Sequence, residues 1–88
     1  MDKKIENLRG KIDKIDGELV NLLVERVSIV KKIGAIKKEA KKPILDEDRW
    51  REVVESTVSL AQKKGLSPTF VKKIFDIIHD FSRDLQKQ

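Results

Sequence analysis

Arg26 is the strongest candidate for a functional residue, because it is a charged residue in an otherwise apolar series. Apolar residues recur at intervals of three and four, and the series runs through Ile5, Leu8, Ile12, Ile15, Leu19, Leu22, Ile29, Ile33 and Ile36, with Arg26 standing in seventh place. Burying an unpaired guanidinium is unfavourable by several kcal/mol, so this side chain needs a partner. Two partners fit the sequence equally well. One is an internal partner, reached through a salt bridge or by a snorkelling side chain and supplied by an acidic residue of the second helix, and the other is a bound anion.

Other polar residues share the helical register of Arg26. Lys37 follows it by eleven residues, close to three turns, so both side chains can face one side of a helix. Ser82 and Gln86 are four residues apart and also share a face. Arg9 precedes Arg26 by seventeen residues, which is roughly 25 Å along a helix axis. A small ligand therefore cannot contact both arginines of one helix, but in an antiparallel pair of such helices Arg9 of one copy would lie beside Arg26 of the other.

Three helices are expected to position these residues. The first covers about residues 4–40 and ends before Pro43. The second begins near Asp46, a good capping residue, and ends at Gly65. The third begins at Ser67-Pro68, which reads as an N-cap followed by proline at the first helical position. No strand pattern is visible, so the sequence predicts an all-α fold with one long and two shorter helices in a single domain, residues 1–88.

The length of the first helix predicts a homodimer. At 1.5 Å per residue the helix is roughly 50–55 Å long, whereas a compact domain of this size has a radius of gyration of about 12 Å. The chain is too short to cover the whole apolar stripe of such a helix. A second copy is the simplest partner for it.

Composition restricts the possible functions. The 88 residues contain no cysteine and a single histidine, His79, which argues against disulfides, thiolate chemistry, a histidine-based metal cluster and a Ser-His-Asp triad. Lys and Arg outnumber Asp and Glu by 20 to 15, so the surface favours anions without selecting nucleic acid, acidic membrane or a small molecule. We expect a cytoplasmic protein without a membrane segment, because no long apolar run and no signal-peptide block are visible.

Taken in order, the polar and apolar residues resemble those of the all-helical AroQ-type (type II) chorismate mutases. The resemblance covers nearly the whole chain and is carried by Leu8-Arg9, Ile12, Ile15-Asp16, Leu22-Leu23, Glu25-Arg26, Ile33-Gly34, Lys37, Pro43-Ile44, Asp46, Asp48-Arg49, Gly65-Leu66, Ile77-Ile78, Ser82 and Gln86. It implies three helices per chain in an intertwined homodimer. It also implies the Claisen rearrangement of chorismate to prephenate in aromatic amino-acid biosynthesis, without a metal or other cofactor.

The resemblance assigns the reacting groups first. Arg26 corresponds to the arginine that pairs with a substrate carboxylate. Lys37 corresponds to the lysine that donates to the breaking ether oxygen and helps to hold a carboxylate. Gln86 corresponds to the second donor to that ether oxygen. These three residues are the expected catalytic groups.

Four further residues are expected to bind the substrate. Arg9 corresponds to an arginine that the other subunit contributes to the site. Ser82 corresponds to a hydroxyl near the ring carboxylate. Asp46 and Arg49 lie in the short stretch that opens the second helix, closes the site and orients the substrate.

Trp50 departs from the family pattern. In the family pattern a glutamate stands here and accepts a hydrogen bond from the ring hydroxyl of the substrate, as it does in the best-studied members, whereas the only polar group of tryptophan is a donor. One interpretation is that a neighbouring acid or a backbone carbonyl takes over this role. A second is an isochorismate pyruvate lyase-like enzyme of the same fold, and a third is an inactive relative.

Two non-catalytic alternatives belong to other classes of protein. Lysine pairs such as Lys31-Lys32 and Lys63-Lys64 would suit a basic helical dimer that binds nucleic acid, but the pairs are spread over all three helices and no recognition-helix signature accompanies them. A structural coiled coil or adaptor for a partner protein would place an apolar residue at position 26 without loss of function. We therefore predict a chorismate-binding enzyme that binds neither nucleic acid nor membrane.

Overall fold

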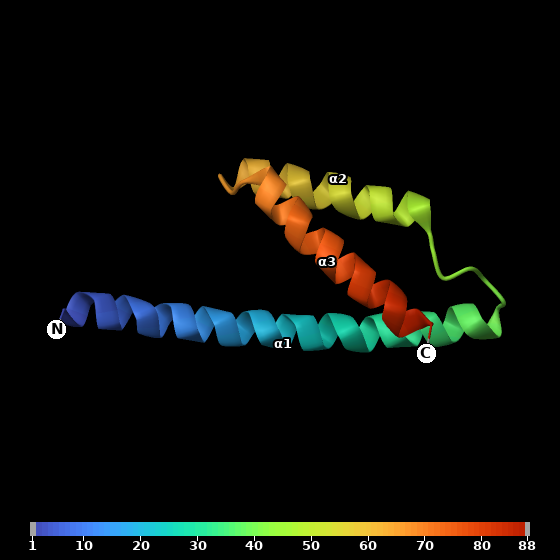
Figure 1. Cartoon of the computed structure of the whole chain (residues 1–88), viewed down its shortest axis with the longest axis horizontal. Helices are drawn as coiled ribbons and strands as arrows, with labels where there is room; N and C mark the ends of the chain where they lie inside the picture. The colour runs from blue at the N-terminus through green and yellow to red at the C-terminus, as the bar shows by residue number, and fades with distance from the viewer. Residues whose placement is uncertain (1, 88) are drawn as a thin grey trace.

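The computed structural model describes residues 2–87, which form three helices. The helices are α1 (Lys3–Glu39), α2 (Glu47–Lys63) and α3 (Pro68–Gln86), and Figure 1 shows their arrangement. No strand occurs within residues 2–87. The all-helical fold class and the order of one long and two shorter helices are thus confirmed.

The helix ends follow the local signals in the sequence. The side chain of Asp46 caps α2 by accepting the backbone N–H of Arg49 at 3.0 Å. Ser67 caps α3 in the same way, through the backbone N–H of Phe70 at 3.2 Å. Gly65 follows α2 with a φ of +75°, a left-handed conformation that glycine adopts without steric penalty. These termini fix the length of the two shorter helices.

The middle of the fold is α3, which packs against both α1 and α2, whereas the backbones of α1 and α2 stay apart along their described lengths. In Figure 1, α3 descends from the far end of α2 to the C-terminal part of α1, and the N-terminal part of α1 extends beyond both. The chain measures 58 × 25 × 15 Å and its radius of gyration is 16.7 Å. A compact chain of this length would have a radius of about 12 Å.

The contact between α1 and α3 depends on a glycine. Val30 and Gly34 are the buried residues of α1, and a Cβ atom on Gly34 would lie 3.1 Å from Cγ of Gln86. The absence of a side chain therefore lets α3 approach α1 closely. The buried positions are each one residue beyond Ile29 and Ile33 of the predicted apolar series, because α3 covers only one edge of that stripe.

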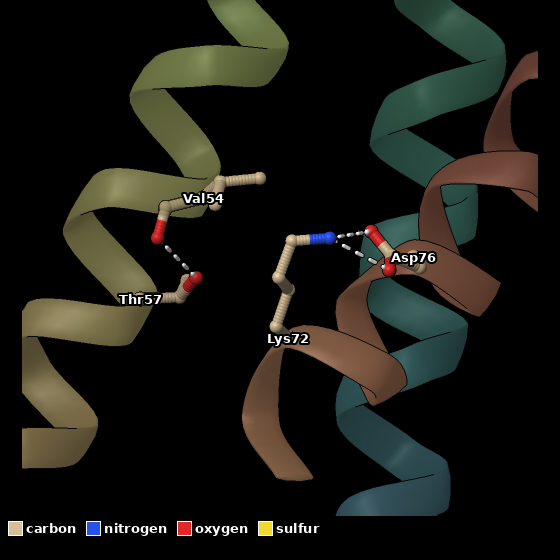
Figure 2. A network of polar contacts seen from close by, with 4 residues as sticks. All are labelled: Val54, Thr57, Lys72 and Asp76. Atoms are coloured by element: carbon tan, nitrogen blue, oxygen red, sulfur yellow. Dashed lines mark hydrogen bonds and ion pairs between the residues drawn. The ribbon is translucent and has the colours of Figure 1, made fainter. Parts of the chain in front are cut away.

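Apolar packing joins α2 to α3, where Ala61 and Val71 are buried. The polar contacts nearby stay within single helices, as Figure 2 shows. Thr57 donates through its hydroxyl to the carbonyl oxygen of Val54 one turn back, and Lys72 pairs with Asp76 at 3.0 Å on α3. Exposed pairs of this kind contribute about 0.5 kcal/mol or less. The α2–α3 contact is therefore held mainly by the burial of apolar surface.

The predicted apolar stripe of α1 is largely uncovered within one chain. We call its N-terminal part the α1 apolar face, and it consists of Ile5, Leu8, Ile12, Ile15, Leu19 and Leu22, which are between 48% and 60% exposed. On α3, Phe70, Ile77 and Phe81 are also more than half exposed. No helix within residues 2–87 combines the length and apolar character needed to cross a bilayer.

Candidate active site

A cavity of about 280 Å³ lies among the three helices and the segment that joins α1 to α2. Its polar lining comes from Arg26, Lys37, Asp46, Arg49, Trp50, His79, Ser82 and Gln86, and its apolar lining from Ile29, Val30, Ile33, Ile44 and Val53. The volume is close to the lower end of the range for small-molecule sites. Six of the seven residues singled out from the sequence therefore meet in one place.

Arg9 is the residue that the fold keeps apart. It is exposed on the N-terminal part of α1 and does not line the cavity. The seventeen residues between it and Arg26 correspond to about 25 Å of helix, as expected from the sequence. The cavity of a single chain is thus formed without this arginine.

Arg26 projects from α1 toward α3. Its Nη1 donates to Oγ of Ser82 at 2.7 Å. Within residues 2–87 no carboxylate lies close enough to pair with it, so the structure does not contain the internal salt bridge considered above. Burial lowers the pKa of Arg26, and the nearby positive charge of Arg49 lowers it further. Its charged form is therefore held at a site that disfavours it in the absence of an anion.

Lys37 and Gln86 lie together in the cavity lining. The ammonium group of Lys37 donates to the backbone carbonyl of Ile44 at 2.9 Å and to Oε1 of Gln86 at 3.0 Å. The Nε2 group of Gln86 in turn donates to the backbone carbonyl of Ser82 at 3.4 Å. These contacts fix two strong hydrogen-bond donors near each other, and both residues are half-buried.

The first turn of α2 supplies Asp46 and Arg49. Both are exposed and lie beside the cavity, and the cap that Asp46 forms on the Arg49 N–H fixes their relative position. Arg49 adds a third cation to those of Arg26 and Lys37. Positive charge beside apolar walls suits a small organic anion. The cations pair with the carboxylates of such a ligand, and the apolar walls exclude water from its hydrocarbon part.

Trp50 and His79 form an aromatic pair in the same lining. Their rings stack with centroids 4.0 Å apart and planes inclined by 18°. His79 is not among the site residues predicted from the sequence, where its single occurrence only argued against other kinds of chemistry. A signal was available, since His79 precedes Ser82 by three residues and Gln86 by seven, which puts all three on one face of a helix.

Comparison with known proteins identifies relatives over almost the whole chain. The family model described as chorismate mutase type II matches residues 8–87. A chorismate mutase from Methanocaldococcus jannaschii is 32% identical over 88 residues, which is 100% of this chain and 89% of the relative. A bifunctional chorismate mutase/prephenate dehydratase from Escherichia coli K12 is 31% identical over 71 residues, or 81% of this chain and 18% of the larger relative.

Solved structures show the same arrangement of helices. A chorismate mutase from Helicobacter pylori in complex with prephenate superimposes with a TM-score of 0.82 at 34% identity, covering 98% of this chain and 92% of that one. A conserved hypothetical protein from Pyrococcus furiosus superimposes with a TM-score of 0.75, also at 34% identity, over 98% of this chain and 99% of that one. The likeness therefore extends to both sequence and fold.

Proposed function

Because the chain belongs to the type II chorismate mutase family, we propose that it converts chorismate to prephenate in the cavity among α1, α2 and α3. The observation that carries this proposal is the meeting of Arg26, Lys37, Arg49 and Gln86 around one cavity in which residues 2–87 offer no carboxylate to Arg26. A dianionic substrate supplies the missing charges. The chain acts as one helical domain in this proposal.

Substrate binding selects a conformation. Chorismate must fold its enolpyruvyl arm over the ring before its two reacting carbons can meet, and a site that holds this conformer removes much of the entropic barrier. Arg26 binds one carboxylate, with Ser82 beside it at 2.7 Å as a second polar contact. Arg49 and Asp46 orient the substrate from the start of α2.

The rearrangement itself requires stabilisation of charge. The carbon–oxygen bond breaks as the new carbon–carbon bond forms, and negative charge grows on the ether oxygen. Lys37 and the Nε2 group of Gln86 donate to that oxygen. Fixed donors of this kind stabilise the transition state more than the ground state and need no reorganisation during the reaction. The reaction is intramolecular, so the roles left to the protein are positioning and electrostatic stabilisation.

The working unit in this proposal is a homodimer with two equivalent sites. The α1 apolar face is more than 45% exposed at every position in one chain, and a second copy of α1 offers a matching face. An antiparallel arrangement carries Arg9 to the partner's cavity, where it binds the second carboxylate. The homodimer is supported by the length of α1 and by the exposure of this face.

Trp50 supports a second candidate, an isochorismate pyruvate lyase-like activity, because it lies in the cavity lining at a position where the family resemblance predicts a glutamate. The test is to incubate purified protein separately with chorismate and with isochorismate and to identify the products. Prephenate from chorismate is expected. Release of pyruvate from isochorismate, without prephenate from chorismate, would favour the second candidate instead.

A further inference from the structure

The hydrogen-bond donors of the cavity greatly outnumber its available acceptors. Arg26, Lys37, Arg49 and Trp50 can only donate through their side chains. Two of the acceptors are already in use. Oγ of Ser82 accepts a hydrogen bond from Arg26, and Oε1 of Gln86 accepts one from Lys37. A substrate that carries a ring hydroxyl brings one more donor into the cavity. An acceptor must be found for it, since an unsatisfied buried hydroxyl is unfavourable by about 1–3 kcal/mol.

His79 is a cavity residue with a free acceptor. Within the described chain its imidazole makes no hydrogen bond, and a neutral imidazole has one nitrogen that accepts. The ring is half-buried and lines the cavity one turn before Ser82 on α3. Asp46 is the other candidate, but it is exposed and one of its oxygens already caps α2.

Trp50 determines the orientation of the His79 ring. The rings stack at 4.0 Å with an 18° inclination, so the indole covers one face of the imidazole and leaves its edge, which carries both nitrogens, available for hydrogen bonds. The edge of the imidazole is the part that forms hydrogen bonds. The indole of Trp50 has no hydrogen-bond acceptor, so its role is to orient His79, and the imidazole is the group that binds the hydroxyl.

We propose that His79, held by its stack on Trp50, is the acceptor for the ring hydroxyl of the substrate and sets the preference for a hydroxylated ring. The inference rests on the proposed chorismate mutase activity. It assigns a substrate-binding role to a residue outside the set predicted from the sequence. It also gives the tryptophan a positioning role in place of a direct contact with the hydroxyl.

The test compares two substrates in two variants. His79→Phe keeps a ring to stack on Trp50 but removes the acceptor, and His79→Gln replaces the imidazole with an amide that can accept. Each is assayed with chorismate and with the analogue in which hydrogen replaces the ring hydroxyl. His79→Phe should lower kcat/KM for chorismate roughly tenfold to a hundredfold while leaving the analogue nearly unaffected. His79→Gln should recover part of the preference.

Asp46→Asn provides the matched comparison, because asparagine retains the cap on α2. If this variant loses the preference for the hydroxyl and His79→Phe retains it, the acceptor is Asp46 and the proposal is overturned. Equal losses with both substrates in His79→Phe would also overturn it, since that result indicates a packing role.

A binding measurement separates this inference from the proposed function. Trp50 is the only tryptophan and lies in the cavity lining, so its fluorescence reports occupancy directly. Titration with prephenate should give a Kd that rises in His79→Phe. If the wild-type protein turns over neither chorismate nor the analogue, the proposed function fails. An unchanged Kd for prephenate in His79→Phe would overturn the role of His79, whatever the turnover.

Discussion

Lys37 and Gln86 are 49 positions apart in the sequence, yet Nζ of the lysine lies 3.0 Å from Oε1 of the glutamine. The contact joins α1 to the last turn of α3. It leaves the Nε2 group of Gln86 as a donor beside the ammonium group. Two donors fixed by each other are preorganised for one oxygen atom of a ligand.

The first prediction concerns this pair. Lys37→Met and Gln86→Leu should each lower kcat by about 100- to 1,000-fold, because each removes one preorganised donor. The double variant should lose less than the product of the two factors, since the residues contact each other. Kinetics followed through chorismate consumption measure the effect. The control is Lys38→Met, which changes a neighbouring lysine that does not line the cavity and should retain wild-type turnover.

The second prediction separates activity from stability at Arg26. Arg26→Leu should lower kcat/KM by orders of magnitude and raise the free energy of unfolding by about 1 kcal/mol, because the guanidinium is partly buried and finds no carboxylate partner among residues 2–87. Its lowered pKa, which burial and Arg49 cause, points in the same direction. Thermal unfolding and steady-state kinetics are measured on the same preparation. A destabilised variant with full activity per folded molecule would show that Arg26 has a structural role only.

The third prediction tests the close approach of α3 to α1. In Gly34→Ala the new methyl group would meet Cγ of Gln86 at 3.1 Å and its Cα at 3.3 Å, so α3 has to move by a few tenths of an ångström. We expect turnover to fall by about tenfold, because the glutamine loses its position relative to Lys37. Gly17→Ala is the matched control, since nothing lies within 4 Å of that site. It should keep full activity and stabilise α1 by about 0.5–1 kcal/mol.

The fourth prediction tests the shared site of the homodimer. Arg9→Ala and Lys37→Ala should each be nearly inactive alone. In a mixed dimer one site carries both changes and the other carries neither, provided that Arg9 serves the partner's site and Lys37 its own. Refolding an equal mixture should then restore about a quarter of wild-type activity, because half of the dimers are mixed and each has one intact site.

Mass spectrometry of the refolded sample verifies that mixed dimers form. With mixed dimers present, a complete lack of recovered activity would mean that Arg9 and Lys37 of one chain serve the same site. Light scattering at micromolar concentration should give the mass of two chains. A well-folded particle of one chain's mass would exclude the proposed assembly.

Local signals made the helices predictable from the sequence. Asp46, Ser67 and Gly65 act on residues within one turn of themselves, so their effect on a helix end does not depend on the rest of the fold. The expected meeting of Arg26 with Lys37 also followed from the register of one helix. Such short-range relationships are expressed directly in the spacing of residues.

Contacts between helices were less predictable. Ser82 is the partner of Arg26 across 56 positions, and the pairing depends on where α3 crosses α1. That crossing in turn depends on Gly34, whose importance is visible only once Gln86 lies against it. His79 could have been placed on the face of Ser82 and Gln86 by its spacing, but its stack on Trp50 depends on how α2 packs against α3.

The uncovered apolar face of α1 has a thermodynamic consequence for any sample of this protein. In the proposed homodimer, unfolding releases two chains, so the folded fraction follows the law of mass action. Each tenfold dilution then removes about 1.4 kcal/mol from the apparent stability, and the melting temperature falls with it. Catalysis, assembly and folding would all be lost over the same range of dilution.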